Sequence, residues 1–220
     1  MTGISPLKNL RRVYCAGPLF CQAERQEMEQ IAGLLRREGF EPFLPHADGM
    51  EFARVLPSLE RRGFSLEQSG RLLHEAIFAL DTYQVIVDCG SLVFNMNGRV
   101  PDEGAVAEMT MAWMLGKPLV LYKDDVRSTI AGRDNPLIVG QARFATVERI
   151  EELPRRLAEQ IADLTLAVDW SVDCPPHVAQ TVKTGEQLWR QIGPLDAKAD
   201  VERIADIVLD LVGDKTPLRG

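Results

Sequence analysis

A single carboxylate, Glu108, stands in the otherwise apolar stretch AVAEMTMAWML, which runs from Ala105 to Leu115. Burying a carboxylate among apolar side chains costs free energy unless the group has a partner or a task. A carboxylate held in an apolar wall is suited to act as a nucleophile, or as a charge stabiliser, at an oxocarbenium-like sugar carbon. The alternative is a structural glutamate that is paired with an arginine or a backbone amide.

Asp102 stands six residues before Glu108, where the helix that carries Glu108 is expected to begin. Pro101 and Asp102 are ordinary residues for a helix start, so Asp102 could simply cap the helix. The separation is about one and two-thirds turns, which lets both carboxylates lie in the same wall of a cleft. Ala105 and Ala112 flank Glu108 on the same helix face and leave room for a ligand to approach it.

Tyr14 lies at the end of the first predicted strand. A nucleophilic carboxylate works best when it is ionised, and in an apolar wall it needs a hydroxyl or amide donor to stay so. We therefore expect the Tyr14 hydroxyl to be the donor to Glu108.

The elements that must position these residues alternate between strand and helix. The predicted strands include RRVYCAG, EPFLP, QVIVDC and PLVLY, and the segments between them, such as AERQEMEQIAGLLRREGF and SGRLLHEAIFALDTY, have helical spacing. This alternation is typical of βαβ units. We predict an α/β fold with a doubly wound parallel sheet of about five strands and helices on both faces.

Two further features bear on the domain organisation. The stretch HADGMEFARVLPSLERRGFSLEQSG is polar and broken and is interpreted as an insertion. From about residue 169 the chain has two more helical patterns, the last with its apolar residues on one side. We predict an α/β domain over residues 1–168 and a C-terminal helical extension, residues 169–220, packed on it.

Three loops should meet at one edge of the sheet, because ligands of such folds bind beyond the carboxyl ends of the strands. They are AGPLF (residues 16–20), NMNGRVPDEG (residues 95–104) and YKDDVRS (residues 122–128), which begins a long polar loop. None of them is a GxGxxG dinucleotide fingerprint or a GxxxxGK[ST] phosphate loop. A tightly bound NAD or ATP is therefore not expected, and we predict neither a cofactor nor a metal.

Composition limits the partners and the compartment. The chain has 220 residues, 45% of them hydrophobic, and a formal net charge of −7, which argues against nucleic acids and anionic membranes as partners. The opening MTGISPLKNLRR lacks an apolar run long enough for a signal peptide, and no segment approaches a membrane span. The four scattered cysteines are interpreted as reduced thiols. A soluble, cytoplasmic protein is expected.

The motifs YCAGPLF, FLP with HADG, GRVPDEGAVAE and NPLI resemble those of the nucleoside 2-deoxyribosyltransferase family over roughly residues 12–150. The most specific element is the D-E-G-x-x-x-E pattern. The resemblance implies a flavodoxin-like fold and transfer of a 2-deoxyribosyl group between nucleobases, with a 2′-deoxynucleoside and a free nucleobase as partners. It also implies that Glu108 is the nucleophile, forming a covalent glycosyl-enzyme, and that Asp102 helps to place the sugar and its hydroxyls.

Candidate substrate-binding residues lie in the predicted loops, at the end of the first strand and in NPLI. They are Tyr14, Gly17, Pro18, Leu19, Phe20, Asn97, Gly98, Gly104 and Asn135. By resemblance, the turn after the first strand lines the base and sugar pocket, and Leu19 and Phe20 offer apolar surface to the base. Asn135 matches an asparagine that a neighbouring subunit supplies in the family, which implies a homodimer or an assembly of dimers.

One position departs from the family pattern. Family members commonly carry an aspartate in the helix before the third strand, where it relays a proton to the leaving base, and alignment through ALDTYQVIV puts Ala76 there. The leaving-group acid is therefore unassigned. An N-glycoside hydrolase of nucleosides or nucleoside monophosphates, and a non-catalytic nucleoside- or nucleotide-binding protein, remain alternatives to the transferase. AGPLF lacks a Ser/Gly/Arg phosphate cradle, which favours a nucleoside over its 5′-phosphate.

Overall fold

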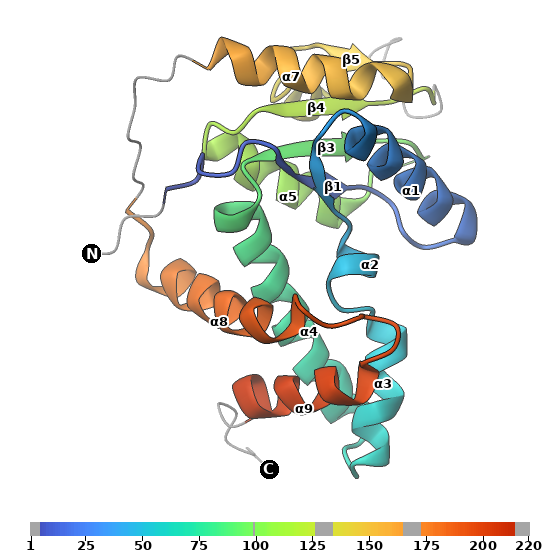
Figure 1. Cartoon of the computed structure of the whole chain (residues 1–220), viewed down its shortest axis with the longest axis vertical. Coiled ribbons are helices and arrows are strands. Elements are labelled where there is room, and N and C mark those ends of the chain that lie inside the picture. The colour runs from blue at the N-terminus through green and yellow to red at the C-terminus, as the bar shows by residue number, and fades with distance from the viewer. Residues whose placement is uncertain (1–4, 99, 126–133, 165–172, 214–220) are drawn as a thin grey trace. The chain divides into compact units, whose positions relative to one another are not determined.

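The computed structural model describes residues 5–98, 100–125, 134–164 and 173–213 (Figure 1). Part of the predicted polar loop, residues 126–133, lies outside them, as does the predicted domain boundary at residues 168 and 169. The chain forms two compact units. The α/β unit comprises Met1–Leu44 and Val85–Asp173, and the helical unit comprises Pro45–Gln84 and Cys174–Gly220.

The α/β unit is built on a five-stranded parallel sheet. Its strands are β1 (Arg12–Ala16), β2 (Glu41–Phe43), β3 (Ser91–Asn95), β4 (Leu119–Tyr122) and β5 (Thr146–Val147). The strand order is β2-β1-β3-β4-β5, and every neighbouring pair is parallel. This is the flavodoxin-like order, with its switch point between β1 and β3. The predicted α/β fold with a doubly wound parallel sheet is confirmed.

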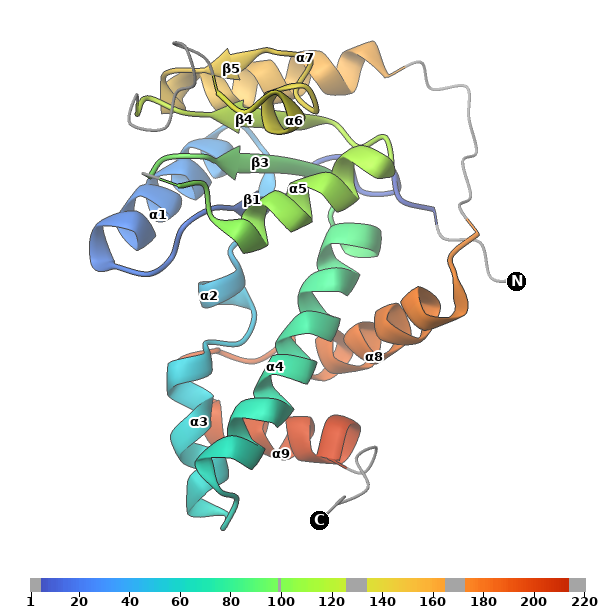
Figure 2. The same ribbon diagram turned by 180° about the vertical axis from the view of Figure 1, so that it is seen from behind.

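Helices cover both faces of this sheet. They are α1 (Gln22–Arg37), α5 (Glu103–Met114), the short α6 (Pro136–Val139), the 3₁₀ turn η2 (Ile150–Glu152) and α7 (Leu153–Asp163). Figures 1 and 2 show α1 and α7 on one face of the sheet and α5 on the other. The helical spacing predicted over α1 is confirmed, and its apolar residues Met28, Ile31 and Leu35 are buried. The helix ends at Arg37, and Gly39 follows with a φ of 75°.

The helical unit contains α2 (Pro45–Asp48), α3 (Phe52–Arg61), α4 (Leu66–Tyr83), α8 (Pro176–Ile192) and α9 (Val201–Val212). The last four of these helices pack around one apolar core, to which α2 contributes no residue. The stretch predicted as a broken insertion contains α3, most of α2 and the first turn of α4. Gly185 lets α8 approach α4 closely, because a Cβ there would lie 2.0 Å from the carbonyl oxygen of Ala79. On the surface, Arg62, the C-cap of α3, forms ion pairs with Glu202 and Asp206 of α9.

The prediction that QVIVDC is a strand is wrong. Residues Gln84–Asp88 form a π-helical turn, η1, that continues from α4, and the third strand is the next apolar run, Ser91–Asn95. Periodicity alone cannot separate a short buried strand from a buried helical segment, and here two apolar runs follow each other. The assignment of Ala76 to the position of the leaving-group acid stays a prediction. Ala76 lies in α4, the helix before the third strand, and is buried in the core of the helical unit.

The division into residues 1–168 and 169–220 stays a prediction. The two compact units of the structure differ from it, because they group residues 45–84 with the C-terminal helices. All four cysteines lie in the described part of the chain, and no disulfide joins them. Among the described residues, no helix is long and apolar enough to cross a bilayer.

Candidate active site

Glu108 and Tyr14 meet in the α/β unit. The Tyr14 hydroxyl donates a hydrogen bond to Glu108 Oε1 over 2.7 Å. Tyr14 is on β1, with its ring fully buried against Phe43, while Glu108 is half-buried on α5. A rigid strand therefore holds the donor, and the donor fixes one carboxylate oxygen. Hydrogen bonding to the charged form of a carboxylate favours that form, as a nucleophile requires.

Asp102 is the N-cap of α5. Its Oδ2 accepts a hydrogen bond from the backbone N–H of Ala105 over 2.8 Å, which satisfies one of the unpaired amides at the helix start. Its other oxygen, Oδ1, has no partner among the described residues. Burial, with a smaller contribution from Glu103 and Glu24, raises the pKa of Asp102 against the effect of the Ala105 hydrogen bond. Capping thus uses one oxygen of Asp102, and the other accepts no hydrogen bond from the described residues.

The turn after β1 is held by the first turn of α1. Glu24 accepts hydrogen bonds from the backbone N–H groups of Phe20 and Cys21, and Arg25 donates to the carbonyl of Leu19. Gly17 and Pro18 are buried, whereas the Phe20 side chain is 80% exposed. The turn therefore combines a fixed backbone with an aromatic ring that is open to a ligand.

Gly17 has a steric reason to be glycine. A Cβ at this position would lie 2.8 Å from Met28 Sδ and 2.9 Å from Asn95 Cβ. Both neighbours are fully buried, so neither can move aside cheaply. The close approach packs the end of β1 against β3 and α1 at the switch point of the sheet.

Asn97 and Gly98 lie in the loop between β3 and α5, and Gly104 lies in α5 itself. The Asn97 side chain is used within the protein, since it donates to Glu27 and accepts from the backbone N–H of Asp124. Gly98 adopts a φ of 125°, a conformation that side-chain-bearing residues rarely adopt. Gly104 is exposed in the first turn of α5. This part of the loop is therefore shaped by internal contacts.

Asn135 is exposed and caps α6. Its Oδ1 accepts a hydrogen bond from the backbone N–H of Leu137 over 3.0 Å. Its Nδ2 has no hydrogen-bond partner in the part of the chain that the structure describes. The capping bond fixes the side chain and leaves the amide donor facing outward.

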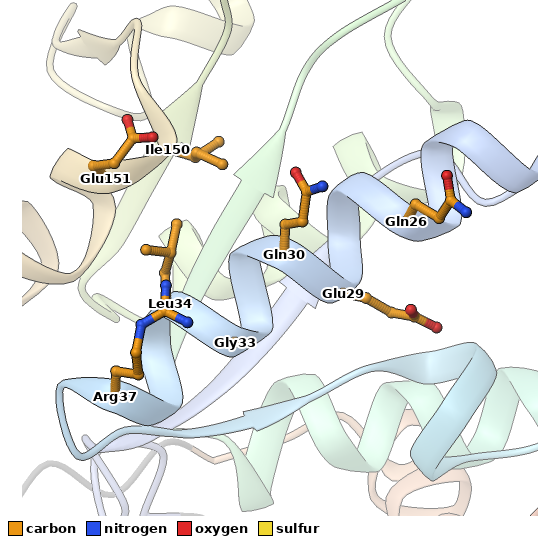
Figure 3. A pocket seen from close by; sticks show the side chains of 8 residues that line it. All are labelled: Gln26, Glu29, Gln30, Gly33, Leu34, Arg37, Ile150 and Glu151. Atoms are coloured by element: carbon orange, nitrogen blue, oxygen red, sulfur yellow. The ribbon is translucent and has the colours of Figure 1, made fainter.

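Two open grooves lie in the α/β unit, and the lining of neither includes Tyr14, Asp102 or Glu108. One, of about 660 Å³, is lined by Pro18, Asn97 and Gly98 at the carboxyl edge of the sheet, together with acidic side chains of α1 and of the segment after β4. The other, of about 710 Å³, lies between α1 and η2 (Figure 3) and contains none of the residues that the sequence singled out. The groove at the carboxyl edge is the one that matches the expected ligand position.

Sequence reasoning missed two carboxylates. Glu27 of α1 accepts hydrogen bonds from Asn95, Asn97 and Tyr122. In the sequence it is an ordinary polar position of an amphipathic helix, and nothing there indicates these contacts. Asp81, near the end of α4 in the helical unit, loses hydration, which raises its pKa to about 7. A carboxyl group in that state can hold a proton near neutral pH, a property of general acids.

Comparison with known proteins gives one family match, and it covers these site residues. A family model described as nucleoside 2-deoxyribosyltransferase matches residues 13–173, which include Tyr14, Asp102, Glu108 and Asn135. No curated protein matches the chain. Among solved structures, a conserved protein from Enterococcus faecalis V583 is similar, at 22% identity and a TM-score of 0.46, covering 68% of this chain and 98% of that chain. The chain belongs to the nucleoside 2-deoxyribosyltransferase family.

Proposed function

We propose that this protein transfers the 2-deoxyribosyl group between nucleobases through a covalent intermediate on Glu108. Membership of the family supports deoxyribosyl transfer in general and implies nucleoside and nucleobase substrates. The observation that carries the finer assignment is the hydrogen bond from Tyr14 to Glu108 in a half-buried setting. A protein that only bound nucleosides would have no need of a carboxylate held in this way.

In the first half-reaction, a carboxylate oxygen of Glu108 forms a bond to C1′ of the 2′-deoxynucleoside. The C1′–N bond breaks, its electron pair leaves with the base, and the base takes up a proton. In the second half-reaction, an incoming base attacks C1′ from the opposite face, loses its N–H proton and releases Glu108 as a carboxylate. Two displacements at one carbon retain its configuration.

The other site residues would bind and orient the substrate. Asp102 has one oxygen committed to Ala105, so its second oxygen can accept a hydrogen bond from a sugar hydroxyl. Leu19 and the exposed ring of Phe20 would offer apolar surface to the base. In this proposal the stability of α5 and the placement of the sugar depend on the same side chain.

Product analysis tests this function. The protein is incubated with each of the four 2′-deoxynucleosides, with and without a second free base, and the products are separated by chromatography. A transferase forms the new nucleoside, and Glu108→Gln should abolish both base release and exchange. Glu103→Gln is the matched control, because Glu103 is an exposed glutamate in the first turn of the same helix. Full activity of Glu108→Gln would refute the proposal.

The same assay separates the alternatives. A hydrolase shares the first half-reaction, so it would release base and free deoxyribose even when an acceptor base is present. A nucleoside-binding protein would release no base but would still bind a deoxynucleoside. Parallel incubation with deoxynucleoside 5′-monophosphates decides between the nucleoside, which we favour, and its phosphate.

We also propose that the protein assembles as a homodimer, or as an assembly of dimers, through the α6 segment. Leu137 and Phe144 are 80% and 73% exposed, and Trp113 and Met114 at the end of α5 are 49% and 67% exposed. Gln141 donates a hydrogen bond to Thr110 of α5, which ties the two regions together. Large exposed apolar side chains that gather on one surface are typical of protein interfaces. Asn135 begins this segment, where it would reach a neighbour's pocket.

Sedimentation velocity at micromolar concentration tests the assembly. Phe144→Asp should shift the protein toward the monomer, and the substitution suits the backbone, since Phe144 has a φ of 60°. Leu66→Asp is the control, because Leu66 is a similarly exposed apolar residue in the helical unit. A wild-type monomer with full activity would contradict this proposal.

A further inference from the structure

Glu27 is the centre of a hydrogen-bond network at the carboxyl edge of the sheet. Its Oε2 accepts from Asn95 Nδ2 over 2.8 Å, and its Oε1 accepts from Asn97 Nδ2 over 3.0 Å and from the Tyr122 hydroxyl over 3.2 Å. These donors come from the end of β3, the loop after it and the end of β4. Burial raises the pKa of Tyr122, so its hydroxyl stays protonated as a donor.

In both asparagines the Nδ2 group and the Oδ1 atom form hydrogen bonds, which fixes the orientation of the two side-chain amides. Asn95 Oδ1 accepts from the backbone N–H of Asn97 over 3.0 Å, and Asn97 Oδ1 accepts from the backbone N–H of Asp124 over 3.1 Å. Flipping either amide would place a donor against a donor. The network therefore has one arrangement, in which Glu27 is the acceptor that α1 supplies.

The same network shapes the chain that leads to Asp102. The backbone N–H of Met96 donates to the carbonyl of Tyr122, and that of Gly98 donates to Asp125. Asp102 and α5 follow within a few residues. Hydrogen bonds thus connect the loop between β3 and α5 to α1 and to the segment after β4. Asp102 stands at the end of this loop.

We propose that Glu27 is a positioning residue for the transfer reaction, which acts by holding the loop between β3 and α5 so that Asp102 meets the sugar. This inference rests on the proposed function. Glu27 itself does not have to touch the substrate, because its oxygens already face three internal donors. Small errors in the placement of a substrate-binding group cost large factors in rate, even when their source is remote.

The two acceptor oxygens of Glu27 are essential to this role. A glutamine has one acceptor oxygen and one NH₂ group in place of two acceptor oxygens. In either orientation, its NH₂ group would face an asparagine NH₂ group, so at least one hydrogen bond is lost. Glu27→Gln therefore disturbs the loop while it preserves the size and the helix propensity of the side chain.

The matched control is Glu29→Gln. Glu29 stands two residues further along α1, is exposed, and has no hydrogen-bond or ion-pair partner among the described residues (Figure 3). Both variants are compared with wild type by hydrogen–deuterium exchange of the peptides over residues 95–104 and 119–125. Only Glu27→Gln should exchange faster in these peptides, with the rest of the α/β unit unchanged.

Kinetics with a double-mutant cycle completes the test. Glu27→Gln should lower kcat/KM for base release by about tenfold. Because Glu27 acts through Asp102, adding Glu27→Gln to Asp102→Ala should cost little more than Asp102→Ala alone. Glu29→Gln should behave as wild type in every measurement.

The outcomes separate this inference from the proposed function. If the wild-type protein releases no base, the proposed function fails and the claim that Glu27 serves it fails too, while the exchange data still decide whether Glu27 holds the loop. If the wild type is active but Glu27→Gln matches it in exchange and in rate, the inference is overturned. Additive effects of Glu27→Gln and Asp102→Ala would also overturn it.

Discussion

The substitution Tyr14→Phe isolates the hydrogen bond on which the proposed nucleophile depends. It removes only the hydroxyl that lies 2.7 Å from Glu108 Oε1. The buried ring keeps its packing, including the contact with Phe43 at a centroid distance of 5.6 Å. The fold should therefore remain intact, and any change in activity reports on the carboxylate.

The expected magnitude follows from the setting of the bond. A hydrogen bond to a charged group contributes about 1.5–3 kcal/mol, and the half-buried position of Glu108 favours the lower end of that range. A loss of about 1.5 kcal/mol corresponds to roughly one pH unit in an ionisation. Since the lost bond stabilised the carboxylate form, the acidic limb of the pH–rate profile should move to higher pH by about one unit.

The assay is kcat/KM for base release from a deoxynucleoside between about pH 4 and 8. Tyr122→Phe is the control. It removes a hydroxyl that donates a hydrogen bond to a different carboxylate, that of Glu27, and it should leave the acidic limb of the profile in place. An acidic limb that is identical in wild type and Tyr14→Phe would show that the hydroxyl does not control the ionisation of the reacting carboxylate. The reasoning that links Tyr14 to Glu108 would then be refuted.

Substitutions at three further positions should change stability or turnover. Asp102→Ala should lower both stability, by about 1 kcal/mol in denaturant unfolding, and turnover, whereas Asp102→Asn keeps the helix cap and should lose turnover alone. Gly17→Ala should destabilise by about 1–3 kcal/mol, because its Cβ would collide with buried neighbours, and a melting temperature equal to wild type would contradict this. Burial lowers the pKa of Lys117 to about 8, so between pH 8 and 9 the unfolded chain binds more protons and stability should rise with pH. Lys117→Met should abolish that rise in stability, as measured by urea unfolding at each pH. The measurements stop at about pH 9, because burial raises the pKa of the Cys89 thiol to about 12 and above pH 9 this lowers the stability of the folded state as the pH rises.

The fold was predictable where local pattern and burial agree. The strands around Tyr14 and Leu121 and the helices around Ile31 and Glu108 each have an apolar pattern and a clear stop, and these elements appear in the structure. The third strand was misplaced because QVIVDC is rich in β-branched residues yet continues the helix before it as a π-helical turn. Two apolar runs follow each other here, and only the second pairs with β1 and β4 as a strand. The periodicity of a single sequence does not show which of two adjacent apolar runs forms the strand.

The site was predictable in part. The spacing of Asp102 and Glu108 on one helix can be read from the sequence, and the placement of Tyr14 at the end of a strand led to the expected donor. The role of Glu27 could not be foreseen, because its three donors come from three later segments of the chain that only the folded sheet brings together. The raised pKa of Asp81 was equally hidden, since desolvation depends on tertiary packing.

Mass spectrometry of protein quenched with acid during turnover of a 2′-deoxynucleoside shows whether Glu108 forms a covalent bond to the sugar. We expect an added deoxyribosyl mass on the peptide that contains Glu108, and no such mass on Glu108→Gln. The adduct should disappear when a free base is added before the quench, as the second half-reaction removes the sugar. If the active wild-type protein never carries the added mass, or carries it on another residue, Glu108 is not the nucleophile.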